Sequence, residues 1–300
     1  MRAEQVIATH GNTDFDAFGA MLAARLLYPD AVVAIGSLNR NVRDFYRLHA
    51  DELGAISEIG RLELDAIRRL VVVEVASASR LGELEAVALD PNVEKALFDH
   101  HGEQGLPEWV SAESAVFSTD GALTTTLVGI VAERELQPTP LEATAFALGI
   151  HEDTGSLTYA TTTQRDVDAL SWCFRHGARQ DLVNEYLHTP LAAEERTLLN
   201  ALTERLEPVT AHGEEVLVAS VAWPEYVDGV SNLAHKIVDL TDARALVLLV
   251  EMDERVFVVV RSRSDAIDAA AVATAFGGGG HAQAASAIAR SDLASAHRRA

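Results

Sequence analysis

The sequence predicts an α/β protein with a larger domain built on a parallel sheet and a smaller α+β domain after it. Strand-like apolar runs alternate with helical patterns from Met1 to about Asp153, which favours a parallel sheet. One of these runs, Val71-Val72-Val73, is typical of a strand that is buried on both faces. The length of 300 residues exceeds the usual size of a single domain, so we expect two.

In the first domain the expected strands are Val6–Thr9, Ala31–Ile35, Leu70–Val75 and Ala96–Asp99. The helical patterns between them cover Ala17–Leu27, Val42–His49 and Asp51–Ile59. The chain then becomes helical, over Thr124–Leu136, Leu141–Glu152, Thr163–Phe174 and Asp181–Leu187. Apolar residues recur at helical spacing in these segments, and Pro138 and Pro140 separate the first two of them.

A long amphipathic segment, Ala192–Leu206, is predicted to be the helix that connects the two domains. A new pattern then begins, with a strand, a helix, two strands joined by a turn at Asp253-Glu254, and a final helix: Glu215–Ala222, Ser231–Leu240, Ala243–Glu251, Arg255–Arg261 and Ala266–Phe276. We therefore expect a first domain over residues 1–190, a helical linker over 191–206 and a second domain over 207–300.

Composition limits the class of protein. The single cysteine, Cys173, excludes an internal disulfide framework and a thiolate metal cluster, and it fits a reducing cytoplasm. No signal-peptide pattern and no membrane-length apolar run is present, so we expect a cytoplasmic protein without a membrane partner.

The formal net charge of −21 disfavours binding to long duplex nucleic acid, because Lys and Arg must neutralise its phosphates. A small phosphate ligand needs only a local group of cations, and an acidic surface attracts divalent ions. The low aromatic content of 6% argues against a processive exonuclease with a stacking channel.

Metal-ligating residue types follow several of the predicted strands and helices. His10, Asp14 and Asp16 lie on the turn after the first strand, and the later groups are Glu74, Asp99-His100-His101 and Asp153. Because the carboxyl ends of parallel strands meet at one edge of a sheet, we expect these groups to converge there. Ligands of this mixed His and carboxylate kind favour Mn²⁺ or a similar octahedral ion, and two ions that share a bridging carboxylate would use them all. His151, Glu152 and His176 have no patterned partner and are read as ordinary surface or core residues.

The motifs Asp99-His100-His101 and His10-x-x-x-Asp14-x-Asp16-x-x-Gly19 resemble those of the DHH phosphoesterase superfamily. Gly149-Ile150-x-x-Asp153-Thr154-Gly155 resembles its fourth motif, and the segment from Phe276 to Ser286 resembles the glycine-rich signature of the DHHA1 subfamily. The opening motif looks closest to the DHH module of bacterial proteins that continue with CBS domains and a tRNA nucleotidyltransferase-like (poly(A) polymerase) region. The chain is also similar to oligoribonuclease and pAp-phosphatase-type enzymes. The first of these resemblances predicts further C-terminal domains in a longer protein.

This resemblance implies two divalent ions, with Mn²⁺ favoured over Mg²⁺ or Co²⁺. His10 and Asp14 would hold one ion, and Asp16, His100 and Asp153 the other. His101, with Asp99 beside it, would lie close to the substrate as a phosphate-binding or general-acid group. The family has Asp at the bridging position where this chain has Glu74, so we expect a working but modified site; the alternative is a lost bridge and weak or absent activity.

In the second domain, four consecutive glycines expose backbone N–H groups to a ligand, and a helix N-terminus just after them would favour an anion. We expect a phosphate or nucleotide pocket facing the metals, formed by Arg261, Arg263, Ser264, Gly278, Gly279, Gly280 and His281. The alternatives are a plain flexible loop for the glycines and an exposed salt bridge for the arginines.

The motifs together predict a two-metal phosphoesterase that works in an interdomain cleft on short oligonucleotides, linear dinucleotides or nucleoside bisphosphates. One alternative is a catalytically weakened, nucleotide-binding regulatory module, and another is a pyrophosphatase or exopolyphosphatase. The expected partner is a small phosphorylated substrate, and a homodimer is compatible with the sequence.

Overall fold

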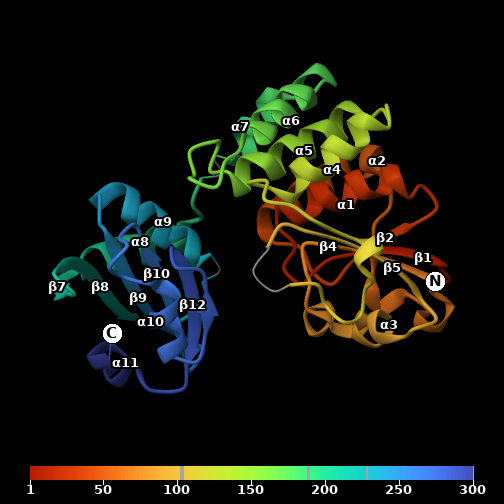
Figure 1. Cartoon of the computed structure of the whole chain (residues 1–300). Helices are drawn as coiled ribbons and strands as arrows, with labels where there is room; N and C mark the ends of the chain where they lie inside the picture. The colour runs from red at the N-terminus through yellow and green to blue at the C-terminus, as the bar shows by residue number, and fades with distance from the viewer. Residues whose placement is uncertain (102–104, 188–189, 228, 300) are drawn as a thin grey trace. The chain divides into compact units, whose positions relative to one another are not determined.

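A six-stranded parallel sheet forms the centre of the first unit among the residues that the structure describes. The computed structural model describes residues 1–101, 105–187, 190–227 and 229–299, in two units, 1–189 and 190–300 (Figure 1). The strand order of the first sheet is β3-β2-β1-β4-β5-β6. Its strands are β1 (Gln5–Ala8), β2 (Val32–Ile35), β3 (Ser57–Glu58), β4 (Arg69–Val73), β5 (Glu94–Asp99) and β6 (Ala115–Phe117). The predicted α/β fold with a parallel sheet is confirmed.

Helices cover both faces of this sheet. Figure 1 shows α1, α4 and α5 on one face and α3 on the other. The helices of the first unit are α1 (Phe15–Leu27), α2 (Arg40–Leu53), α3 (Glu85–Leu89), α4 (Leu123–Glu133), α5 (Pro140–Asp153), α6 (Gln164–Arg175) and α7 (Gln180–Leu187). Along β4, Val71 and Val73 pack into the cluster on the α1 side, whereas Leu70 and Val72 pack into the cluster on the α3 side. The Val-rich strand is therefore buried on both faces, as its sequence predicted.

One predicted helix of the first unit is wrong. Instead of a separate helix over Asp51–Ile59, α2 continues to Leu53 and ends at Gly54, which has a left-handed φ of 78°. Ser57 and Glu58 then pair with β2 as the short edge strand β3. Glycine ends a helix readily in this conformation because it has no Cβ to clash.

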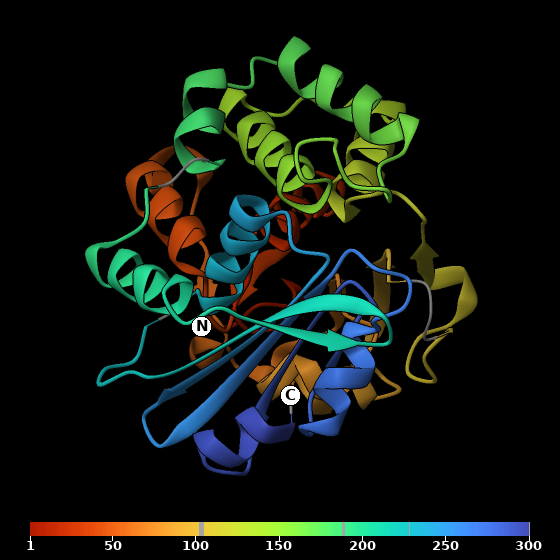
Figure 2. The ribbon, with the colours of Figure 1, turned by 90° about the vertical axis from the view of Figure 1, so that its left-hand side faces the viewer.

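The second unit has a mixed sheet of order β11-β12-β10-β9-β8-β7, and Figure 2 shows its strands side by side. The strands are β7 (Glu207–Ala211), β8 (Glu214–Ala222), β9 (Ala245–Met252), β10 (Arg255–Ser262), β11 (Gly279–Gly280) and β12 (Ala284–Ala289). Strands β8 and β9 are parallel and the other pairs are antiparallel. One face packs against α8 (Ala193–Thr203) and α9 (Val230–Thr241), and the other against α10 (Ala269–Ala275) and α11 (Leu293–Arg299).

Two predictions for the second unit can be compared with the structure: the turn between β9 and β10, and the connecting helix. The turn between β9 and β10 has φ values of 48° at Asp253 and 58° at Glu254, which suit the right-handed twist of a hairpin. The helix expected to connect the domains packs Leu198 and Leu202 into the core of the second unit. That helix, α8, is thus part of the second unit's hydrophobic core.

The glycine run differs from its prediction, because a hairpin rather than a helix follows it. Gly279 and Gly280 pair with β12 as strand β11, and His281 and Ala284 exchange backbone hydrogen bonds in the turn between the two strands. A Cβ at Gly278 would lie 2.0 Å from the carbonyl oxygen of Ser286. The close approach to β12 therefore requires glycine there, and the expected helix N-terminus is absent from this part of the described chain.

Candidate metal centre

The turn after β1 is held so that its polar side chains lie at the N-terminus of α1. Asp14 is the N-cap of this helix, and its Oδ1 accepts a hydrogen bond of 3.0 Å from the backbone N–H of Ala17. The Nδ1 of His10 lies 2.7 Å from the carbonyl oxygen of Gly11. If Nδ1 carries the proton, Nε2 is the nitrogen that can bind a metal.

Asp16 is completely buried, and the N-terminus of α4 holds its carboxylate. Oδ2 accepts a 2.7 Å hydrogen bond from the N–H of Leu123, and Oδ1 accepts one of 2.9 Å from the N–H of Thr124. These amides have no partner within their own helix, so the carboxylate satisfies them and fits the helix dipole. Because both oxygens are held, Asp16 has a fixed orientation.

The imidazole of His100 lies among three carboxylates. Its Nε2 is 3.4 Å from Glu74 Oε1, 3.5 Å from Asp153 Oδ2 and 3.8 Å from Asp16 Oδ2. On the opposite side of the ring, Nδ1 lies 3.1 Å from the carbonyl oxygen of Asp120. A carbonyl can only accept, so a hydrogen bond here requires the proton on Nδ1, which leaves Nε2 as the ring nitrogen that can bind a metal. This is the tautomer that a metal ligand needs.

Glu74, directly after β4, stands at the centre of this group. It is 4% exposed and has a left-handed φ of 65°, and its N–H donates to the carbonyl oxygen of Phe98. Glu74 Oε2 and His100 Nε2 are both buried and have no hydrogen-bond partner within the described part of the chain. Buried polar atoms without partners are rare, and a bound cation would satisfy both.

The side chains form three groups in which the possible ligand atoms lie within 4.8 Å of one another: His10, Asp14 and Glu74; Asp16, Glu74, His100 and Asp153; and Glu74, His100 and His101. All three contain Glu74. The donor set of carboxylate oxygens and imidazole nitrogens fits a divalent ion of the Mn²⁺ type. The cluster can therefore hold a divalent metal, and it brings together the metal-ligating residues expected from the sequence.

The electrostatics of the cluster also favour a cation. Burial, followed by repulsion from neighbouring carboxylates, raises the pKa values of Glu74 and Asp153 well above their usual range. Burial also raises the pKa of Asp16, although attraction to His100 opposes the change. A divalent ion would reverse this balance by stabilising the ionised carboxylates.

Asp99 and His101 form a separate pair at the end of β5. One oxygen of the buried Asp99 accepts hydrogen bonds from both the backbone N–H and the Nδ1 of His101, each 2.9 Å long. Burial alone would raise the pKa of Asp99, but these hydrogen bonds hold it below its usual value. Asp99 therefore fixes the imidazole so that Nε2 is the ring nitrogen directed away from it.

Sequence reasoning missed Glu152, which it read as an ordinary residue. Its Oε2 accepts a hydrogen bond of 2.6 Å from the N–H of Phe15, in the first turn of α1. Burial, with repulsion from Asp14, raises the pKa of Glu152 to about 8. The only sequence signal was its position beside Asp153, because its hydrogen-bond partner lies 137 residues away in the chain.

The predicted phosphate-binding residues of the second unit have local partners. Arg261 Nη2 donates to the carbonyl oxygen of Ser231, and Arg263 forms an exposed ion pair of 2.5 Å with Asp239. Both partners belong to α9, so the two arginines share a face of the sheet. The Oγ of Ser264 accepts a hydrogen bond from the N–H of Ala266, within its own turn.

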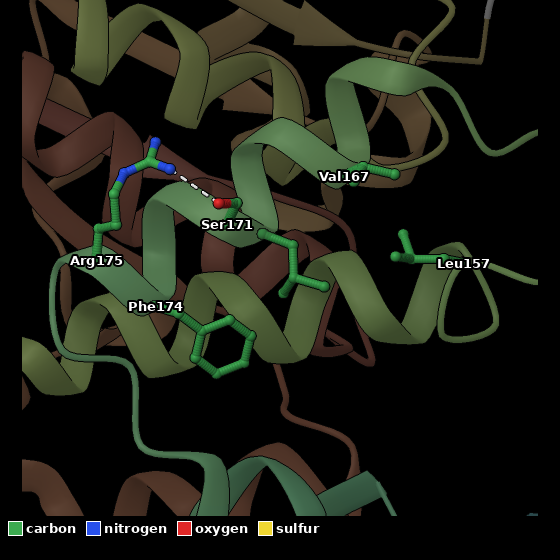
Figure 3. A pocket seen from close by; sticks show the side chains of 6 residues that line it. Leu157, Val167, Ser171, Phe174 and Arg175 are labelled. Carbon is green, nitrogen blue, oxygen red and sulfur yellow. Dashed lines mark hydrogen bonds between the residues drawn. The ribbon is translucent and has the colours of Figure 1, made fainter.

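A pocket elsewhere in the first unit contains none of the predicted site residues. It has a volume of about 550 Å³, and its lining is Leu157, Val167, Leu170, Ser171, Phe174 and Arg175. Figure 3 shows Phe174 and Leu157 at its apolar surface and Arg175 donating to Ser171.

No helix in the described residues is long and apolar enough to cross a membrane.

No protein-family model matches the sequence. Among solved structures, an exopolyphosphatase-related protein from Bacteroides fragilis has a TM-score of 0.79 at 16% identity, covering 99% of this chain and 91% of that one. RecJ in complex with Mn²⁺ from Thermus thermophilus has a TM-score of 0.54 at 17% identity, covering 99% of this chain and 51% of that one. These likenesses concern the fold. The chain is therefore similar in fold to these two proteins.

Among curated proteins, the chain is similar to two A-adding tRNA nucleotidyltransferases. It is 38% identical over 286 residues to the protein of Geobacter sulfurreducens and 26% identical over 286 residues to that of Aquifex aeolicus. Each match covers 95% of this chain, but 32% and 33% of the relatives. The chain thus spans about a third of the length of the curated relatives that it matches.

Proposed function

We propose that this chain is a two-metal phosphoesterase that uses Mn²⁺ to hydrolyse short oligonucleotides, linear dinucleotides or nucleoside bisphosphates. The observation that carries the proposal is the pair of buried, unpartnered atoms, Glu74 Oε2 and His100 Nε2, amid three further carboxylates. The superfamily's fold supports the reaction class.

The three side-chain groups suggest how two ions would share the site. His10 and Asp14 would hold one ion, and Asp16, His100 and Asp153 the other, with Glu74 bridging because its carboxylate belongs to both groups. When bound, two such ions supply Lewis-acid polarisation of a phosphoryl group and lower the pKa of water.

The protein's own residues contribute orientation and proton handling. Asp99 holds His101 through Nδ1, so a hydrogen bond or a proton for a phosphate oxygen would come from Nε2. In the second unit, we propose Arg261, Arg263, Ser264 and His281, with the amides of Gly278, Gly279 and Gly280, for the substrate phosphate or terminal nucleotide. Guanidinium groups suit this role because they pair bidentately with phosphate.

Metal content and hydrolysis test the proposal together. The wild-type protein should bind two Mn²⁺ ions per chain and turn over at least one of a dinucleotide, a longer oligomer or a nucleoside bisphosphate. Glu74→Asp should retain both ions, whereas Glu74→Gln should bind Mn²⁺ at least about 10-fold more weakly because the bridge loses its charge. Glu85→Gln, at an exposed position on α3, is the matched control and should behave as wild type. A wild-type protein that binds no metal would refute the proposal.

A second candidate function follows from the curated relatives. Because the chain matches a third of two A-adding tRNA nucleotidyltransferases, it also fits a nucleotide-binding regulatory module of a longer protein of that kind. Tight binding of a dinucleotide without Mn²⁺-dependent hydrolysis would favour this function. Turnover of pyrophosphate or polyphosphate alone would instead indicate a pyrophosphatase or exopolyphosphatase.

A further inference from the structure

The carboxylate of Asp166, on α6, hydrogen-bonds to the segment 120–125. This segment in turn hydrogen-bonds to His100 and Asp16 in the candidate metal centre. Asp166 is completely buried and accepts five hydrogen bonds. Two come from the N–H and the Oγ1 of Thr163, at 2.7 Å each, and the first of them is part of the capping box at the start of α6. The other three come from the N–H groups of Gly121 and Ala122, at 3.0 and 3.3 Å, and the Oγ1 of Thr125, at 2.6 Å.

Among these donors, only Thr163 takes part in capping α6. The remaining three hold the turn before α4 and its first residues, and Gly121 permits this because a Cβ there would lie 2.9 Å from Asp166 Oδ2. Burial alone would raise the pKa of Asp166, but the hydrogen bonds from Thr125, Thr163 and Gly121 hold it below its usual value. The carboxylate is therefore ionised, and both of its oxygens accept hydrogen bonds.

The bond to Gly121 matters because of the peptide unit to which it belongs. The N–H of Gly121 and the C=O of Asp120 are part of the same planar peptide group, and in a trans peptide they point in opposite directions. Asp166 holds the N–H, and the C=O accepts from Nδ1 of His100. Fixing one end of this group therefore fixes the acceptor that selects the tautomer of His100.

His100 needs such a fixed acceptor. Its other nitrogen, Nε2, faces the carboxylates of Glu74 and Asp153, which would favour a proton on Nε2. A ring protonated there cannot bind a metal through that nitrogen. The carbonyl of Asp120 opposes this by holding the proton on Nδ1.

We propose that Asp166 is a positioning residue that locks the Asp120–Gly121 peptide group, and through it keeps the Nε2 of His100 available to a metal. The same carboxylate holds Ala122 and Thr125, on either side of the Leu123 and Thr124 amides that bind Asp16. Asp166 thus orients two predicted ligands of one ion without touching that ion. The expected effect on metal binding rests on the proposed metal site, whereas the expected effect on the tautomer of His100 does not.

The direct test is the tautomer of His100 in the metal-free 300-residue chain. Its ring ¹⁵N signals can be identified among those of the eleven histidines by their loss in His100→Gln, at a pH where the imidazole is neutral. The wild-type ring should carry its proton on Nδ1. In Asp166→Asn, whose amide cannot accept from five donors, the population protonated on Nε2 should increase. Mn²⁺ affinity should fall about 10-fold, as when other residues that orient a metal ligand are replaced.

Glu142→Gln is the matched control. Glu142 completes the corresponding capping box of α5 with Thr139, so its loss should lower thermal stability without changing the tautomer or the Mn²⁺ affinity. An Asp166→Asn protein that keeps the proton on Nδ1 would overturn the inference. If that variant does not fold, Thr125→Val, which removes a single donor, decides in the same way: a shift towards Nε2–H supports the inference, and no shift overturns it.

The test separates this inference from the proposed function. If wild-type protein binds no Mn²⁺, the proposed function fails, but the tautomer comparison in metal-free protein still decides the role of Asp166. If wild type binds two ions and Asp166→Asn shows an unchanged tautomer and affinity, only the positioning role fails.

Discussion

At the scale of single residues, the candidate site brings together carboxylates that repel one another. Few cationic side chains among the described residues lie near them. Burial raises the pKa values of Glu74, Asp153 and Asp16, and it raises that of Glu152 to about 8 from an ordinary 4.5. Such groups prefer to be neutral in the metal-free fold, and ionising them there costs free energy. The arrangement fits a site that binds a cation, because a cation would stabilise the ionised carboxylates.

The crowded carboxylates predict an unusual pH dependence for the metal-free protein. Between an unfolded pKa of 4.5 and a folded pKa of about 8, Glu152 binds more protons in the folded state than in the unfolded state. The free energy of unfolding should therefore fall as pH rises through this window. Glu152→Gln keeps an oxygen acceptor for Phe15 and cannot ionise. It should be the more stable protein at pH 9, by on the order of 1 kcal/mol or more, and nearly equal at pH 5.

Urea unfolding with a chelator at the two pH values measures this difference. The exposed Glu85→Gln should follow the wild-type curve. A Glu152→Gln protein with the wild-type pH slope would show that Glu152 does not carry the effect.

The sequence predicted which residues meet at the site but not what holds them. His10, Asp14, Asp16, Glu74, His100 and Asp153 all follow strands or lie at helix ends, and parallel topology brings those positions together. Glu152 and Asp166 act through backbone amides 137 and 45 residues away, and no spacing rule connects such partners. Supporting residues of this kind require the tertiary structure.

At the scale of elements, two glycines let three helices approach closely beside the metal centre. A Cβ at Gly149 of α5 would lie 2.7 Å from the carbonyl oxygen of Phe15 and 3.0 Å from the Cα of Asp16. A Cβ at Gly19 of α1 would lie 2.7 Å from the Oγ1 of Thr124 in α4. The distance between α1, which carries Asp16, and α5, which carries Asp153, therefore depends on the absence of a side chain at Gly149.

Gly149→Ala should consequently weaken both the fold and the metal site. The added methyl group meets backbone atoms that cannot move alone, so we expect a loss of about 1–3 kcal/mol in the free energy of unfolding. Because α5 must move away from α1, Mn²⁺ affinity should fall as well. Chemical denaturation and metal titration measure the two effects.

Gly129→Ala provides the comparison for this change, because its Cβ would contact only the far end of Arg165, a flexible side chain, at 3.3 Å. Alanine favours a helix over glycine by up to about 1 kcal/mol, so this variant should be as stable as wild type or more so. Unchanged Mn²⁺ binding in Gly149→Ala would show that α1 and α5 need not be so close.

The elements that the sequence analysis did not identify are those with weak hydrophobic patterns. The central strands β1, β2, β4 and β5 lie within one or two residues of their predicted bounds, because burial on both faces gives continuous apolar runs. The edge strands β3 and β6 are only two and three residues long, too short for a pattern that stands out. The glycine run was predicted to bind an anion ahead of a helix, with a flexible loop as the alternative, whereas Gly279 and Gly280 pair with β12.

At the scale of the whole molecule, the chain consists of two units with separate cores. Every described group that could hold a metal lies in the first unit, within residues 10–153. The predicted phosphate-binding residues lie in the second unit. Binding of Mn²⁺ alone should therefore affect the first unit and not the second.

Hydrogen exchange of the full chain, with and without Mn²⁺, tests this separation. A ligand that binds only the folded state stabilises it by about 2.7 kcal/mol at 100 times its dissociation constant. We expect that gain as slower amide exchange across β1, β4, β5 and α5, because unfolding of the first unit must release the ions. Exchange in β8, β9 and β10 should stay unchanged, since no described ligand group belongs to them. Asp153→Asn should remove most of the protection in the first unit and leave the second as it was. Equal protection of both units by Mn²⁺ alone would contradict the separation and would show that the two units unfold as one.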